Sequence, residues 1–182
     1  MKVGIAISLF SLLSAKYTGY DIHFMGEQTE EERVSVMSKN IIDGLRYAYE
    51  AYCRGDIEGA VDAIDVDPNI LWIEPKEFYA GGTYRGREAV IDYLTLAYAA
   101  TEQVQNVPEE ILVVGDKIAV FLHFQAWPKG GGEPREGHIA DVYTLHEGKV
   151  VQMQAYADQA SARKAIGSPH HSCQRTQVGS FP

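Results

Sequence analysis

The sequence predicts an α+β fold in which helices come first and a curved, mainly antiparallel sheet follows. Apolar residues recur at helical spacing up to about residue 101, and after Pro108 the pattern changes to strands joined by short turns. The 182 residues, of which 46% are hydrophobic, can bury one substantial core but hardly two. We therefore expect one domain, with the helices packed on one face of the sheet around a conical pocket.

A long helix is expected between Thr29 and Gly55. Thr29-Glu-Glu-Glu32 has the pattern of a capping box with acidic residues in the first turn, and Gly55 suits a C-terminal cap. Asp56 can then cap a second, short helix that ends near Ile64. The apolar stripe of the long helix consists of Val34, Met37, Ile41, Leu45, Ala48 and Tyr52.

The next segment is expected to hold one strand and one helix. Asp67-Pro68-Asn69 breaks the second helix, and a strand runs from Ile70 to Glu74. Gly81-Gly82 and Tyr84-Arg-Gly86 form a turn into a third helix, about residues 87–101.

Four strands and a last helix complete the predicted domain. The strands are expected at about residues 111–114, 117–127, 135–145 and 149–157, and the helix at 158–166. Gly115-Asp116 and Glu147-Gly148 are short enough for hairpin turns, whereas residues 128–134 form a longer, glycine-rich one.

Composition excludes several classes of partner and cofactor. Sixteen basic and 25 acidic residues give a net charge of −9 with no basic cluster, so we expect neither nucleic-acid binding nor stable membrane association. No metal and no organic cofactor are expected either. Gly130-Gly-Gly132 lies between strands and not before a helix, and His170, His171 and Cys173 stand in a Pro/Ser-rich segment without fixed geometry.

The two ends are expected to lie outside the domain, which we place at residues 29–167. Residues 1–28 form an N-terminal extension, in which Val3–Leu13 resembles a weak, short signal-peptide core. Met25 or Met37 could instead be the start of a cytoplasmic protein. We favour a cytoplasmic location, with export as the alternative, and expect residues 168–182 to be a disordered tail.

Two carboxylates stand out because they interrupt apolar strands. Glu74 follows Ile70-Leu-Trp-Ile73, and Asp141 lies within His138-Ile-Ala-Asp-Val-Tyr-Thr-Leu145. A carboxyl in an apolar setting needs a raised pKa, a partner or a water-filled cavity. We therefore expect both to face a pocket, with the pKa of Asp141 well above the ~3.9 of a free aspartate. Glu74 could alternatively be a solvated residue at a strand end.

A series of short motifs resembles the nuclear-transport-factor-2-like (NTF2-like) superfamily. The motifs occur in the order and spacing typical of its SnoaL-like polyketide cyclase and ketosteroid isomerase-like group, over about Ile41 to Gly167, and they are Tyr52-Cys-Arg-Gly-Asp56, Trp72-Ile-Glu-Pro75, Tyr84-Arg-Gly86, Asp141–Lys149 and Asp158–Gly167. The resemblance implies a cone-shaped, cystatin-like sheet wrapped around N-terminal helices. It also implies a homodimer formed through the open face of the sheet.

The same resemblance implies roles for the two carboxyls. Glu74 occupies the position of the aspartate base of a ketosteroid isomerase, and Asp141 that of the protonated aspartate in its oxyanion hole. In SnoaL-type cyclases the residue at the Asp141 position is the acid and base of an aldol ring closure. The chain departs from the isomerase pattern at Ala48, where that family keeps a tyrosine; Tyr52 lies one turn away on the same helical face.

Strand register adds a third candidate. If the glycine-rich hairpin is centred on Gly132, His123 lies opposite Asp141, and Gln154 lies on its other side. A slip of one residue would turn His123 to the other face. On this register the catalytic candidates are Asp141, Glu74 and His123, and the expected substrate-binding residues are Tyr52, Trp72, Trp127, Tyr143, Gln154 and Tyr156.

These residues favour cofactor-free acid/base catalysis. A carboxylate would remove a proton alpha to a carbonyl and a protonated group would stabilise the enolate, which gives isomerisation or aldol-type cyclisation. The expected ligand is a small hydrophobic carbonyl compound, similar to a polyketide or a steroid. The alternative is a non-catalytic ligand-binding or dimerisation module of the same fold.

Overall fold

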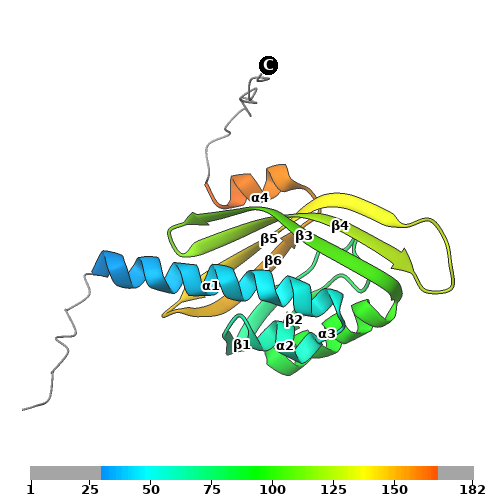
Figure 1. Ribbon diagram of the computed structural model, residues 1–182, viewed down its shortest axis with the longest axis horizontal. Helices are drawn as coiled ribbons and strands as arrows, with labels where there is room; N and C mark the ends of the chain where they lie inside the picture. The colour runs from blue at the N-terminus through cyan, green and yellow to red at the C-terminus, as the bar shows by residue number, and fades with distance from the viewer. Residues whose placement is uncertain (1–29, 168–182) are drawn as a thin grey trace, which may run out of the picture.

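The structure is a computed structural model that describes residues 30–167 (Figure 1). The expectations for residues 1–28 and for the tail, including His170, His171 and Cys173, lie outside the described residues. The elements follow in the order α1 (Glu30–Cys53), α2 (Ile57–Asp62), β1 (Val66–Ile73), β2 (Thr83–Arg85), α3 (Arg87–Ala99), β3 (Thr101–Val114), β4 (Lys117–Pro128), β5 (Arg135–His146), β6 (Lys149–Tyr156) and α4 (Gln159–Ala165).

The six strands form one curved, unclosed sheet in the order β2-β1-β6-β5-β4-β3. All neighbouring pairs are antiparallel except β1 and β6, which are parallel. The expected α+β class and the mainly antiparallel sheet are therefore confirmed. The parallel pair places the end of β1 beside the middle of β6. Only β5 lies between β6 and β4.

Helices lie on both faces of the sheet. Figure 1 shows α1, α2 and α3 on one side, which we call the concave face, and α4 on the other, the open face. On the concave face the main core joins Leu45 of α1, Val90 of α3 and Leu122 of β4, all fully buried. On the open face a smaller core packs Ala162 of α4 against Phe121 of β4. None of the described helices is long and apolar enough to cross a membrane.

Three predicted boundaries were wrong. β1 starts at Val66, so Asp67-Pro68-Asn69 lies inside the strand, where the pairing with β6 is irregular. The expected turn at Tyr84 is a short edge strand, β2. β3 runs through Pro108 instead of starting after it. Proline, which has no N–H, is tolerated there because β3 is an edge strand and its pairing with β4 shifts next to Pro108.

Candidate active site

The concave face and the three helices enclose a cavity of about 560 Å³. Its lining comes from every one of these helices, from β1, β3, β4 and β5, and from the loop after β1. Both carboxyls singled out in the sequence, Glu74 and Asp141, line it. They reach the same cavity from two strands that are separated only by β6. This shared cavity was predicted from the sequence.

Glu74 directly follows β1 and is only 8% exposed. Its backbone N–H donates to the carbonyl oxygen of Gly82 at 2.8 Å, which holds the chain where it leaves the strand. The indole Nε1 of Trp72 donates to its Oε1 at 2.6 Å. Burial first, and then the negative charge of Asp141, raise the pKa of Glu74 to about 8, although hydrogen bonds from Trp72 and Tyr93 act in the opposite direction. Glu74 is therefore mostly protonated at neutral pH.

Asp141 lies in the middle of β5, between Val120 of β4 and Ala155 of β6. The Tyr49 hydroxyl on α1 donates to its Oδ2 at 2.8 Å. Burial raises the pKa of Asp141 to about 6, and the hydrogen bond from Tyr49 limits the rise. The predicted elevation is confirmed in direction. At pH 7, however, a group with this pKa is mostly ionised and accepts hydrogen bonds more often than it donates them.

A chain of hydroxyls supports the Asp141 carboxylate. The hydroxyl oxygens of Tyr49 and Tyr143 are 2.9 Å apart. Because Tyr49 uses its own proton on Asp141, Tyr143 is the donor in this second bond. Burial, followed by the charge of Asp141, raises the pKa of both tyrosines, so each keeps its proton at any pH at which the protein works. The second oxygen of Asp141, Oδ1, has no such partner within the described residues and is open to a ligand.

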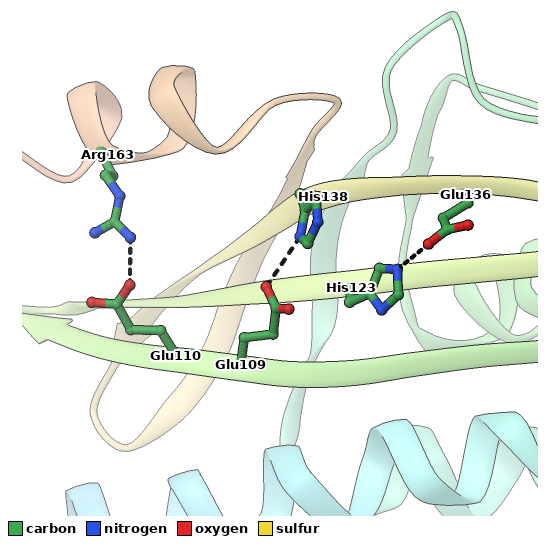
Figure 2. A network of polar contacts seen from close by, with 6 residues as sticks. All are labelled: Glu109, Glu110, His123, Glu136, His138 and Arg163. Atoms are coloured by element: carbon green, nitrogen blue, oxygen red, sulfur yellow. Dashed lines mark hydrogen bonds and ion pairs between the residues drawn. The ribbon is translucent and has the colours of Figure 1, made fainter. Parts of the chain in front are cut away.

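The structure does not place His123 in the cavity. His123 pairs with His138 of β5, three residues from the expected partner Asp141, whose actual neighbour on β4 is Val120. A shift by an odd number of residues moves a side chain to the other face of a sheet, so His123 lies on the open face. There its ring stacks on His138 with centroids 5.0 Å apart, and its Nε2 contacts Glu136 Oε1 at 2.7 Å (Figure 2).

The other polar contacts of Figure 2 also belong to the open face. The Nδ1 atom of His138 lies 3.1 Å from Oε2 of Glu109, and Arg163 of α4 pairs with Glu110 of β3. These are exposed or half-exposed pairs, which contribute little to stability. Because His123 pairs with His138 on this face, the predicted register, in which His123 lies opposite Asp141, was wrong.

The expected substrate-binding residues divide between the two faces. Tyr52, Trp72 and Tyr143 line the cavity, whereas Trp127, Gln154 and Tyr156 are not among the described residues that do. Gln154 pairs with Val142 because the pairing of β5 and β6 shifts after Thr144, and this turns its side chain away from Asp141. Tyr156 packs instead against the small core beneath α4.

Two functional residues were missed in the sequence. Tyr49, which was not among the expected site residues, donates a hydrogen bond to Asp141, and Tyr93 of α3 contacts Glu74. The signal for Tyr49 was its position four residues after Leu45 on a helix whose apolar stripe includes Leu45. Tyr52 was expected near the carboxyls instead, because it lies one turn after Ala48 on the predicted apolar stripe, to which Tyr49 does not belong. No comparable signal marks Tyr93.

Among the residues that the structure describes, no group of three or more His, Cys, Asp or Glu side chains is placed to hold a metal ion. The polar groups that the structure brings together in the cavity are the two carboxyls and the hydroxyl and indole groups around them.

Comparisons with known proteins agree with this architecture. The model of the SnoaL-like domain family matches residues 45–153. No match is found among curated proteins. The structure is similar to an NTF2-like protein of unknown function from Burkholderia pseudomallei, with 22% identity over 70% of this chain and 97% of the other and a TM-score of 0.58.

Two further solved structures are named after the ketosteroid isomerase-like and polyketide cyclase groups that the sequence resembles. One is a protein with a ketosteroid isomerase-like fold from Catenulispora acidiphila, in complex with trimethylamine, with 16% identity over 71% and 93% of the two chains and a TM-score of 0.56. The other is named as a SnoaL-like polyketide cyclase, from Jannaschia sp., with 18% identity over 72% and 94% and a TM-score of 0.55. At these identities the likeness concerns the fold.

Proposed function

This chain belongs to the SnoaL-like domain family, with an NTF2-like fold, and on that premise we propose that it is a cofactor-free acid/base enzyme. Its reaction would be an isomerisation or aldol-type cyclisation alpha to a carbonyl of a small hydrophobic compound. One observation carries the proposal: two buried carboxyls with different proton affinities, Glu74 and Asp141, face one largely apolar cavity.

The order of the two pKa values assigns the roles. At neutral pH Asp141 is the carboxylate and Glu74 holds a proton, so Asp141 is the base and Glu74 the acid. This assignment is the reverse of the one that the resemblance to ketosteroid isomerases implies. Its physical cause is that both carboxyls are buried but Glu74 also feels the charge of Asp141, whereas the hydrogen bond from Tyr49 limits the rise in the pKa of Asp141.

The proposed reaction starts when Asp141 Oδ1 accepts a proton from the carbon next to the ligand carbonyl. Glu74 gives a hydrogen bond or its proton to the carbonyl oxygen, which stabilises the enolate or forms the enol. Return of the proton from Asp141 to a different carbon, while the enol oxygen gives any proton it received back to Glu74, completes an isomerisation. In a cyclisation the enol carbon attacks a second carbonyl of the ligand, Asp141 gives its proton to the new alkoxide, and the enol oxygen returns its proton to Glu74.

The proposal predicts a bell-shaped pH profile for proton abstraction. The rate should rise as Asp141 ionises around pH 6 and fall as Glu74 ionises around pH 8, with a maximum near pH 7. Exchange of the alpha protons of 2-tetralone, an apolar fused-ring ketone, in heavy water can be followed by proton NMR. We expect exchange to be faster than in buffer alone, and we expect its rate to increase with the protein concentration.

A ketone that binds without faster exchange would show that the cavity is a ligand-binding module without turnover. A rate that keeps rising above pH 8 would contradict the role of Glu74 as the acid.

We also propose that the chain is a homodimer formed through the open face of the sheet. On that face Val107, which neighbours His123, is 51% exposed beside the stacked histidines. Light scattering after gel filtration should give about twice the 20.2 kDa of one chain. Val107→Glu should lower the mass toward one chain, whereas Leu96→Glu, at an equally exposed site on α3, should not. Equal effects of both changes would place the interface elsewhere.

A further inference from the structure

The cavity has an unbalanced charge. Its interior holds Glu74 and Asp141, and the exposed acid Glu77 also lines it, whereas the carboxylate of Glu136, another lining residue, contacts His123 on the open face. Among the described lining residues the one basic side chain is Arg135, which is exposed at the start of β5. Within the described part of the chain, no basic group of the cavity interior therefore neutralises the two carboxyls, and the sequence as a whole carries a net charge of −9.

Aromatic rings surround the same carboxyls. Tyr52 and Tyr93 line the cavity together with Glu74, and burial, followed by the charge of Glu74, raises the pKa of both tyrosines. The faces of aromatic rings attract cations, most strongly where water is excluded. The aromatic residues that line this part of the cavity are Tyr49, Tyr52, Trp72, Tyr93 and Tyr143.

We propose that the cavity binds an apolar amine in its ammonium form, with the nitrogen beside Glu74 and Asp141 and the organic groups against the aromatic side chains. The inference rests on the proposed function only in taking the same cavity as its site. Binding of the amine needs no turnover.

A neutral apolar ligand fits the charges less well. It would displace water from the Asp141 carboxylate, which would keep only the hydrogen bond from Tyr49. Asp141 would then tend to take up a proton on binding. A cation has the opposite effect, because it stabilises the ionised forms of both carboxyls and favours release of the proton held by Glu74. Proton uptake on binding therefore indicates a neutral ligand, and proton release indicates a cation.

The test compares benzyltrimethylammonium with neopentylbenzene, its uncharged isostere. Fluorescence titration can follow both, because Trp72 lines the cavity. We expect the cation to bind about tenfold more tightly at pH 7 and to gain about a further tenfold by pH 9. Calorimetry in two buffers of different ionisation enthalpy should show proton release for the cation.

The pH dependence can be assigned to one residue. The titratable groups around Glu74 are Asp141 and the tyrosines at 52, 93 and 143, and burial raises the pKa of all three tyrosines above its ordinary value of 10. Glu74 is thus the group whose charge changes between pH 7 and 9. Glu74→Gln should abolish the gain in affinity between pH 7 and 9. Glu77→Gln, at an exposed lining position, should leave the gain intact.

Equal or tighter binding of neopentylbenzene, or failure of both compounds to bind, would overturn the inference. So would an affinity for the cation that falls between pH 7 and 9 in the unaltered chain, a readout that needs no variant to fold. Exchange of 2-tetralone protons without a preference for the cation would reject the amine and leave the acid/base proposal standing.

Discussion

Glu74→Gln should stabilise the protein at high pH by several kcal/mol. In the unfolded chain glutamate has a pKa near 4.3, whereas burial and the charge of Asp141 raise the pKa of Glu74 in the folded state to about 8. Below pH 4 both states are protonated, and the residue does not make stability depend on pH. As the pH rises, the unfolded state ionises first, so stability is lost progressively until Glu74 ionises in the folded state as well.

The loss reaches about 5 kcal/mol above pH 8, and glutamine, which cannot ionise, avoids it. Urea unfolding at pH 4, 7 and 9 should therefore show a difference between variant and parent that is near zero at pH 4 and largest at pH 9. Glu77→Gln, in the exposed loop after β1, is the matched control and should change stability little at any pH. A Glu74→Gln protein that is less stable than the parent at pH 9 would mean that Glu74 is ionised and favourably paired.

The sequence was sufficient to identify the carboxyl pair because both residues break apolar strand patterns. Glu74 and Asp141 are costly in such surroundings unless they face a cavity, and each position could be recognised without knowing its neighbours. The helices and the two short hairpins were recognisable for a similar reason, because capping residues, turn glycines and hydrophobic periodicity are all visible within a short stretch of sequence. What joined the two carboxyls in one cavity was the fold implied by the family resemblance.

Strand register could not be obtained in the same way. The loop between β4 and β5 contains Gly130, Gly131 and Gly132, all with positive φ, and glycines accept several turn geometries. The actual pairing of Ala126 with Arg135 centres the hairpin earlier than Gly132. Because side chains alternate between faces, this odd shift moved His123 out of the proposed site.

A single irregularity removed Gln154 as well. The pairing of β5 and β6 shifts by one residue between Thr144 and Leu145, so the count from the hairpin turn fails beyond that point. Tyr49 was missed for a different reason. On an amphipathic helix the period shows which residues are buried, but not which buried hydroxyl meets a carboxylate from a strand that is 92 positions away.

Asp141→Asn should reduce alpha-proton exchange by at least about a hundredfold. Asparagine keeps the shape and can still accept the hydrogen bond from Tyr49, but it cannot remove a proton. Its stability should equal or exceed that of the parent at pH 7, because burial raises the pKa of Asp141 to about 6 and ionisation of the folded state therefore costs free energy. His123→Asn, on the open face, is the control and should keep the exchange rate within about twofold.

The two carboxyl variants together decide which group is the base. If exchange survives Asp141→Asn and is lost in Glu74→Gln, the roles are those of a ketosteroid isomerase and not those that the pKa order assigns. Tyr49→Phe adds a finer test, because the Tyr49 hydrogen bond lowers the pKa of Asp141 and its loss should move the acidic limb of the pH profile upward. An unchanged acidic limb in this variant would mean that the ionisation governing the rate near pH 6 belongs to another group.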